Sequence, residues 1–308
     1  MAHLTEADRD VYLDHLTPGA DIDLRGTSVT EELLQDLLRA LHDPIIDKPR
    51  FGSLDCHEVR FLGTVSFQGA QISGYASFHK AHFAGDALFK QVQFHFDAGF
   101  HGAQFFGDAE FQEAQFSGEA GFDGVRFFGA ARFVAVRFFD YASFEAARVS
   151  GDAWFFTTRF SYQASFYRAQ FSGDSWFYEV RFAEYARFCE ARFAAMPQFG
   201  PVLCSKEVDL SGAVFEMPVT LDVAAREVRC IRTRWESTAT LRLRYATVDL
   251  SDAVLSFPVA VTAHPAPFIV NNTPVDESLL EGAERGVRLT SEGVKSDLPR
   301  FVIARSWD

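Results

Sequence analysis

Histidines recur at a fixed interval in the first third of this 308-residue chain. His57, His79 and His101 are each 22 residues apart. If 22 residues complete one turn of a repetitive structure, the three imidazoles stack on one face at roughly 4.8 Å. Two such imidazoles could share a zinc ion, but no acid or thiol completes the shell in this pattern. We therefore expect a column of solvated side chains.

Paired carboxylates recur with the same interval. Asp86 with Asp108, and Asp152 with Asp174, could perform acid–base chemistry if each pair stacks. Each of these aspartates follows a glycine, however, and Gly-Asp is typical of a turn, so we interpret them as turn formers.

Motifs for catalysis or cofactor binding are not found in the sequence. It contains no phosphate loop, dinucleotide fingerprint, HExxH or GxSxG. The four cysteines are scattered, which fits thiols in a reducing cytosol better than disulfides or a zinc site; they are Cys56, Cys189, Cys204 and Cys230. We expect no enzymatic activity, no cofactor and no bound metal.

Aromatic and arginine side chains in the second half of the repetitive region form a stronger candidate. Trp154 and Trp176 are 22 residues apart, and alternation along a strand places them outward. Aromatic residues and arginine are concentrated in protein interfaces. The alternative is that the aromatic rings stack across neighbouring turns and only stabilise them. The predicted interface comprises Trp154, Phe156, Tyr167, Trp176, Tyr178, Arg137, Arg159 and Arg181, within a wider arginine set that adds Arg126, Arg148 and Arg192.

These residues belong to an 11-residue repeat that runs from residue 56 to residue 198. Its consensus is F-x-x-A-x-F-x-G-D-A-x, with Phe at position 1 in 12 of 13 units and at position 6 in 11 of 13. In a helix these two positions would point about 140° apart, so a coiled coil is excluded. In an extended chain each Phe and the small residue two places before it both face inward. The predicted core ladder is Phe89, Phe94, Phe100, Phe105, Phe111, Phe116, Phe122, Phe127, Phe133 and Phe138.

Repetition at a fixed period is typical of a solenoid. Small-x-large pentads, as at 109–113, 114–118 and 186–190, resemble those of pentapeptide-repeat proteins. The resemblance implies an all-β solenoid, a right-handed quadrilateral β-helix with four short faces per coil. Here Phe replaces Leu at most centres and every second pentad has six residues, so about 22 residues should make one coil.

The two ends depart from the repeat. We expect a helical N-terminal cap over 1–50, with helices from Thr5 to about Leu16 and from Thr30 to a stop at Asp43-Pro44. Between them GADIDLRG, residues 19–26, indicates an isolated strand or half coil. The regular β-helix should cover 51–198 and irregular coils 199–264, and we expect 265–308 to be a loop or partly disordered tail.

Charge limits the partners. The net charge of −13 disfavours direct nucleic-acid binding, and no run of 18 apolar residues predicts a membrane span. The acidic start of the chain carries no export signal, so a bacterial cytoplasmic protein is expected. We therefore predict a non-enzymatic protein-binding scaffold, working as a homodimer or with a foreign protein.

The resemblance adds one alternative function. Some pentapeptide-repeat proteins bind DNA gyrase as acidic mimics of duplex DNA, and they inhibit the enzyme or protect it from poisons. A gyrase modulator is therefore the second hypothesis. Residues 122–198 hold 8 acids and 9 bases, whereas a DNA mimic should be acidic along its length.

Overall fold

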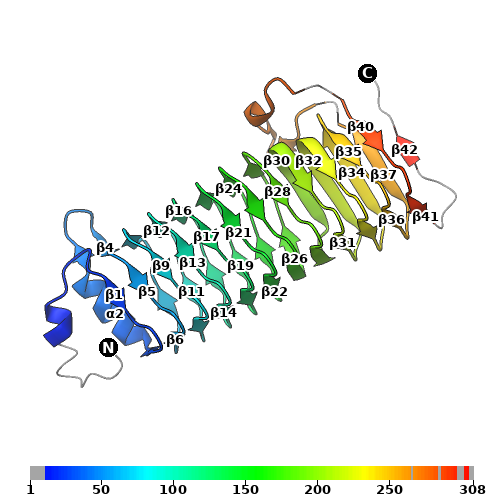
Figure 1. The fold of residues 1–308 in the computed structure, drawn as a ribbon. Coiled ribbons are helices and arrows are strands. Elements are labelled where there is room, and N and C mark those ends of the chain that lie inside the picture. Colours follow the sequence, from blue (N-terminus) through cyan, green and yellow to red (C-terminus); the bar gives the residue numbers. More distant parts are fainter. Residues whose placement is uncertain (1–10, 265, 284–285, 297–301, 305–308) are drawn as a thin grey trace.

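The computed structural model describes residues 11–264, 266–283, 286–296 and 302–304. The chain winds into a straight rod of stacked coils, with the N-terminal helix at one end (Figure 1). Each coil contributes four short strands, and each strand pairs in parallel with the strand one coil further along. This is the expected all-β solenoid with four faces, which we number in the order in which the chain visits them.

The strands of each face are as follows. Face 1 comprises β2 (Ser28–Val29), β6 (Arg60–Phe61), β10 (His82–Phe83), β14 (Gln104–Phe105), β18 (Arg126–Phe127), β22 (Arg148–Val149), the start of β26 (Gln170–Trp176), β29 (Arg192–Ala195), β31 (Val214–Phe215), β33 (Arg234–Trp235), β36 (Val254–Leu255) and β41 (Lys295–Ser296). Face 2 comprises β7 (Val65–Ser66), β11 (Ala87–Leu88), β15 (Ala109–Glu110), β19 (Ala131–Arg132), β23 (Ala153–Trp154), the end of β26, the starts of β30 (Gln198–Asp209), β32 (Val219–Arg229), β34 (Ala239–Arg244) and β37 (Val259–Ala263), and β42 (Val302–Ala304).

Face 3 comprises β4 (Lys48–Phe51), β8 (Gln71–Ile72), β12 (Gln93–Phe94), β16 (Gln115–Phe116), β20 (Arg137–Phe138), β24 (Arg159–Phe160), β27 (Val180–Phe182), the middle of β30 and β32, and the ends of β34 and β37. Face 4 comprises β1 (Ile22–Asp23), β5 (Leu54–Asp55), β9 (Ala76–Ser77), β13 (Ala98–Gly99), β17 (Ala120–Gly121), β21 (Ala142–Ser143), β25 (Ala164–Ser165), β28 (Ala186–Arg187), the ends of β30 and β32, β35 (Thr247–Asp249) and β40 (Arg288–Thr290). Faces 2 and 4 are therefore opposite sides of the rod, as are faces 1 and 3.

Apart from the first and last coils, which contain insertions, coil length changes once along the rod. Phe83 pairs with Phe105, which confirms a coil of 22 residues in the regular region. Beyond Val214 the partner lies 20 residues ahead, as in the pairing of Val214 with Arg234. The long strands β30 and β32 accommodate the change through register shifts. The irregular repeat after residue 199 thus corresponds to shorter coils.

Phenylalanine rings fill the interior. All ten residues of the predicted ladder have an exposed fraction of 1% or less. Each ring stacks on an equivalent ring of a neighbouring coil, as Phe100 does on Phe122 with centroids 4.8 Å apart. Rings from opposite sides of the rod meet edge to face in the interior, as Phe111 and Phe122 do at 5.5 Å and 89°. Both geometries suit the charge distribution of an aromatic ring, and the small residue beside each Phe leaves room for it.

The Gly-Asp corners are held by bonds between coils. The Asp86 carboxylate accepts a hydrogen bond from the Asp108 backbone N–H at 2.9 Å, and Asp152 accepts one from Asp174 at 3.2 Å. A Cβ on Gly107 would lie 2.5 Å from Asp86 Oδ1, so this corner has no space for a side chain. These aspartates therefore form turns, but they bond to the next coil rather than to their own backbone.

The N-terminal residues cover the first coil. β1 pairs with β5 and β2 pairs with β6, so the GADIDLRG stretch belongs to a half coil. Helix α2 (Glu31–Ala40) begins at Thr30, whose side chain accepts a hydrogen bond from the Leu33 N–H at 3.2 Å, and buries Leu33, Leu34 and Leu37. Residues 11–14 are helical, and the rest of the predicted first helix, residues 5–10, lies outside the described residues.

The expectation of a loop or partly disordered tail over 265–308 is wrong where the structure has strands and a 3-10 helix. The segment 266–283, here called the strap, contains the hairpin β38 (Ile269–Val270) and β39 (Thr273–Pro274) and the 3-10 helix η1 (Ser278–Leu280). It folds back over the rod at its C-terminal end (Figure 1). Strands β40, β41 and β42 then add a last coil on β35, β36 and β37. Because the strap is inserted before this coil, the sequence shows no regular interval that would predict it.

The strap is anchored by a second apolar cluster. Outward-facing Leu203 and Ala224 of the rod pack against residues of the strap. The strap residues in this cluster are Phe268, Val270, Val275 and Leu280. Among the described residues, no helix is long and apolar enough to cross a membrane.

Candidate protein interface

The outward column of face 2 holds the aromatic part of the predicted interface. Arg132, Trp154 and Trp176 are register partners on successive coils. The Arg132 guanidinium lies 4.9 Å from the centre of the Trp154 ring, and Phe156 stacks on Trp154 at 6.0 Å. Phe156 in turn meets Tyr178 edge-on at 6.1 Å. We call Arg132, Trp154, Phe156, Trp176 and Tyr178 the face-2 patch; its four aromatic side chains are all half-buried.

The other predicted interface residues lie elsewhere. Tyr167 projects from face 4, where Arg168 covers its ring at 4.8 Å. Arg137, Arg159 and Arg181 lie on face 3. One coil contains two 11-residue units, so residues that share a position in consecutive units lie on opposite faces. The prediction of one combined surface is therefore wrong.

The strap occupies one edge of the predicted interface. Tyr178 packs against the apolar cluster of the strap, and Arg181 Nη1 bonds to Asp276 Oδ2 at 3.0 Å. Trp154, Phe156 and Trp176 are not part of that cluster. These three rings are the part of the face-2 patch that remains available to a partner.

Sequence reasoning missed three exposed phenylalanines. Phe106, Phe128 and Phe139 have exposed fractions of 44–49%. Phe106 and Phe128 stack at 4.9 Å along one edge of the rod. The signal was present as the dipeptide Phe-Phe at 105–106, 127–128 and 138–139, because only the first ring of each pair can point inward.

The histidine column forms as predicted. His57 and His79 stack with ring centres 4.7 Å apart, and His79 and His101 are 6.2 Å apart. The 22-residue pattern of histidines did not include Asp123, which occupies the next rung, where its Oδ2 lies 2.8 Å from His101 Nδ1. The described residues nonetheless include no group of three or more side chains placed to hold a metal ion.

The titrations of this column differ by position. The bond to Asp123 raises the pKa of His101, whereas burial, followed by the positive neighbours His57 and Lys80, lowers the pKa of His79. Burial alone would raise the pKa of Asp123, but bonds from His101 and Ser143 outweigh it and hold that pKa below its usual value. The His101–Asp123 pair is therefore ionic in mildly acidic solution.

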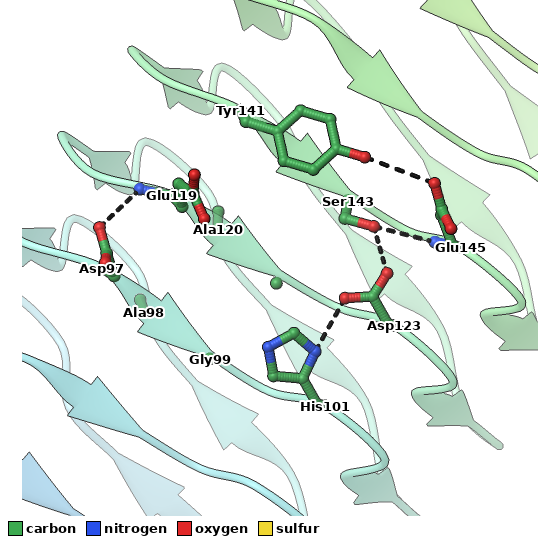
Figure 2. A pocket seen from close by; sticks show the side chains of 11 residues that line it. Asp97, Ala98, Gly99, His101, Glu119, Ala120, Asp123, Tyr141, Ser143 and Glu145 are labelled. Carbon is green, nitrogen blue, oxygen red and sulfur yellow. Dashed lines mark hydrogen bonds and ion pairs between the residues drawn. The ribbon is translucent and has the colours of Figure 1, made fainter.

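Beside this pair, face 4 is hollowed and acidic. Glycine at positions 99 and 121 leaves outward space on two successive strands, and a hollow of about 420 Å³ opens there (Figure 2). Four carboxylates lie around it together with one histidine and one tyrosine, and no lysine or arginine does; these residues are Asp97, Glu119, Asp123, Glu145, His101 and Tyr141. The hollow is thus suited to positive charge.

The hydrogen bonds of the hollow do not form a hydrolytic triad. Ser143 donates to Asp123 rather than to His101 (Figure 2), so no base activates its hydroxyl. Ser165 Oγ donates to Glu145 at 2.8 Å, and the Tyr141 hydroxyl donates to the same carboxylate at 3.4 Å. The two serine bonds link successive coils and the tyrosine bond lies within one coil, so all three have a structural role.

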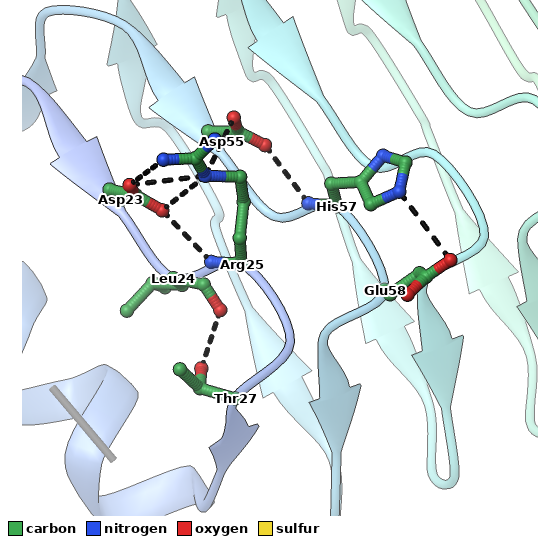
Figure 3. Close-up of polar contacts among 7 residues, drawn as sticks. All are labelled: Asp23, Leu24, Arg25, Thr27, Asp55, His57 and Glu58. Carbon is green, nitrogen blue, oxygen red and sulfur yellow. Dashed lines mark hydrogen bonds and ion pairs between the residues drawn. The ribbon is translucent and has the colours of Figure 1, made fainter. Parts of the chain in front are cut away.

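Polar contacts also close the N-terminal end of face 4. Arg25 bonds to Asp23 at 2.6 Å and lies 3.5 Å from Asp55 of the next coil, which accepts the His57 backbone N–H at 3.1 Å (Figure 3). The Arg25 side-chain bond lowers the pKa of Asp23 to about 2. These contacts fasten the half coil to the first full coil.

Comparison with known proteins identifies the repeat. The family model described as pentapeptide repeats (9 copies) matches residues 50–92, 67–115, 78–126 and 89–136. No curated protein and no solved structure matches the chain significantly. The matched residues form the first coils of a β-helix whose register continues unbroken to Phe193 and Phe215. Residues 50–136 therefore carry repeats of the pentapeptide family, and the same β-helix continues beyond them.

Proposed function

We propose that the chain is a non-enzymatic protein-binding scaffold that uses face 2 of the rod. The observation that supports this proposal is the half-exposed column of Trp154 and Trp176 with Phe156 beside it. Tryptophan on a rigid, pre-formed surface is the residue type that most often dominates binding energy. The stacked coils hold these rings in place, so little conformational entropy would be lost on binding.

The contacts of the polar residues support binding rather than catalysis. The ionisable groups of face 4 are bonded to one another across coils, and the described cysteines are free, with Cys56, Cys204 and Cys230 buried. Burial raises the pKa of Cys204 and of Cys230 to about 12, so neither is a reactive thiolate at neutral pH. Free thiols are typical of a reducing compartment, and we include a cytoplasmic location in the proposal.

Affinity capture tests the assignment to face 2. Wild type, Trp154→Ser/Trp176→Ser and the control Tyr75→Ser/Phe96→Ser are used as bait in lysate of the source organism, and bound proteins are identified by mass spectrometry. The control removes two exposed aromatic rings that lie 5.6 Å apart away from face 2. A protein captured by wild type and by the control, but not by the Trp variant, is the expected result. Equal capture by all three would contradict the proposal.

A denaturation measurement separates the two roles of the tryptophans. If face 2 is an interface, Trp176→Ser should change the free energy of unfolding by about 1 kcal/mol or less. A much larger loss would favour the alternative that these rings serve chiefly to stack across coils.

A gyrase modulator remains the second candidate, and the acidic hollow of face 4 is the observation in its favour. The hollow spans only the coils that carry Asp97, Glu119 and Glu145, which makes it short compared with the rod. A supercoiling assay with purified gyrase tests this candidate. Inhibition that is lost in Asp97→Asn/Glu119→Gln would support it, whereas no effect of the wild-type chain would exclude it.

A further inference from the structure

Face 3 carries a ladder of three arginines. Arg137, Arg159 and Arg181 are register partners on β20, β24 and β27. The rings beneath them, Phe138, Phe160 and Phe182, stack at 4.8 Å per coil, which gives the spacing of the rungs. Three guanidinium groups therefore emerge from one line across about 10 Å of the rod.

The last rung of this ladder already binds a carboxylate. Asp276 of the strap bonds to Arg181, and Val275 beside it packs into the apolar cluster over Leu203. The next strap residue, Glu277, bonds to Arg244 at 2.6 Å and 2.8 Å. An acidic, non-helical stretch of the chain itself thus lies on face 3 and uses the C-terminal end of the ladder.

The two preceding rungs are exposed and unneutralised. Arg137 and Arg159 are exposed, and neither forms an ion pair with a described residue. Like charges opposite each other on neighbouring strands are destabilising. An anion placed over both rungs would remove this repulsion, so the ladder favours an acidic ligand.

Glutamines continue the same column towards the N-terminus. Gln115, Gln93 and Gln71 occupy the three rungs before Arg137, and Gln71 donates to Gln93 at 3.0 Å. A glutamine side chain can donate to and accept from a peptide backbone. The column can therefore bind carboxylates at its arginine end and peptide backbone groups at its glutamine end.

From this arrangement we propose that face 3 binds an extended acidic segment of a partner protein, with its carboxylates on Arg137 and Arg159. The segment would continue the path that the strap begins at Arg181. This site lies outside the face-2 patch and does not depend on the function proposed for that patch.

Charge favours a peptide over a nucleic acid at this site. The chain carries a net charge of −13, and Asp97 and Glu119 line the hollow of the adjoining face 4. A duplex spans more than one face and would be repelled by these carboxylates, whereas an extended peptide can remain over face 3.

The experiment uses fluorescein-labelled deca-glutamate as probe and fluorescence anisotropy as readout. Arg137→Gln/Arg159→Gln is the test variant, because Gln already occupies this column at three rungs and the fold should be retained. Arg126→Gln/Arg148→Gln is the matched control: it removes the same charge on face 1, the opposite side of the rod, where Gln104 and Gln170 flank the pair. Circular dichroism verifies that each variant is folded.

The expected result is that wild type and control bind the probe alike, while the test variant binds about tenfold more weakly or worse. Equal weakening in both variants would show non-specific charge attraction and overturn the proposal. Tighter binding of a 20-nucleotide oligo-dA than of deca-glutamate would overturn it in favour of nucleic acid. Absence of probe binding would also overturn it, and a dimer in sedimentation that the test variant dissociates would then identify a second copy as the occupant.

Discussion

In each Phe-Phe dipeptide the first ring points into the rod and the second points outward. Replacing the first ring should therefore destabilise the protein far more than replacing the second. Phe105→Ala removes a buried ring that stacks on Phe83 at 4.4 Å and on Phe127 at 4.9 Å. Phe106→Ala removes a ring that is 49% exposed and has a single stacked phenylalanine, Phe128. The two changes are chemically identical and differ only in the side of the strand.

The expected magnitudes follow from these surroundings. Phe105→Ala should cost about 3 to 5 kcal/mol, because a buried phenylalanine leaves a cavity between fixed coils. Phe106→Ala should cost about 1 kcal/mol or less, since this half-exposed ring loses only its contacts with Phe128 and, at 6.4 Å, with His82. The difference is a large part of the stability of an ordinary domain.

Urea denaturation followed by circular dichroism measures both costs. Hydrogen exchange shows which coils are destabilised, because each coil of a solenoid contacts only its neighbours. In Phe105→Ala, exchange should become faster first at the amides of residues 82–127. Equal costs for the two substitutions, or a loss below about 1 kcal/mol for Phe105→Ala, would refute the inward assignment.

Three further predictions concern the polar contacts. In an NMR titration, His101 should titrate above and His79 below the ordinary histidine pKa. The raised His101 pKa means that the stabilising effect of this pair is complete below the unfolded pKa and is lost as pH rises through the folded one. Asp123→Asn should abolish the rise at His101 and leave the pKa of His79 low, whereas an unchanged His101 would contradict this account. Glu277→Ala leaves the buried Arg244 guanidinium without its carboxylate. A protease should then cut within residues 266–283 while the rod remains intact. A strap that is not cut would contradict the anchoring role of Glu277. Thr30→Ala should cost about 1 kcal/mol and speed hydrogen exchange in helix α2 only, and exchange that spreads along the rod would show that the cap controls the whole array.

The regular part of the fold could be predicted because its signal is local and repeated. The Phe and Ala positions fix which residues face inward, and each new unit repeats the evidence, so the 22-residue coil and the helix beginning at Thr30 follow from the sequence. The strap could not be predicted in this way. Its position depends on Phe268 and Val275 meeting Leu203, a contact between distant segments with no periodic signal.

The predicted site was only partly correct for a related reason. The column of Trp154 and Trp176 follows from the 22-residue interval. Tyr167 shares its position in the 11-residue unit with Phe156 and Tyr178, and that shared position suggested one surface, although alternate units lie on opposite faces of the rod. The hollow of face 4 depends on Gly99 and Gly121 being small where other rungs carry larger side chains, and it becomes visible only when the coils are stacked.

Site-specific photo-crosslinking tests the central claim, that face 2 is a protein-binding surface, most directly. A photoreactive benzoyl-phenylalanine replaces Phe156 on face 2 in one variant and exposed Phe96 in a matched control, and both are irradiated in cells of the source organism. The account predicts a discrete crosslinked protein at position 156 and none at position 96. The same adducts at both positions, or none at position 156, would contradict it.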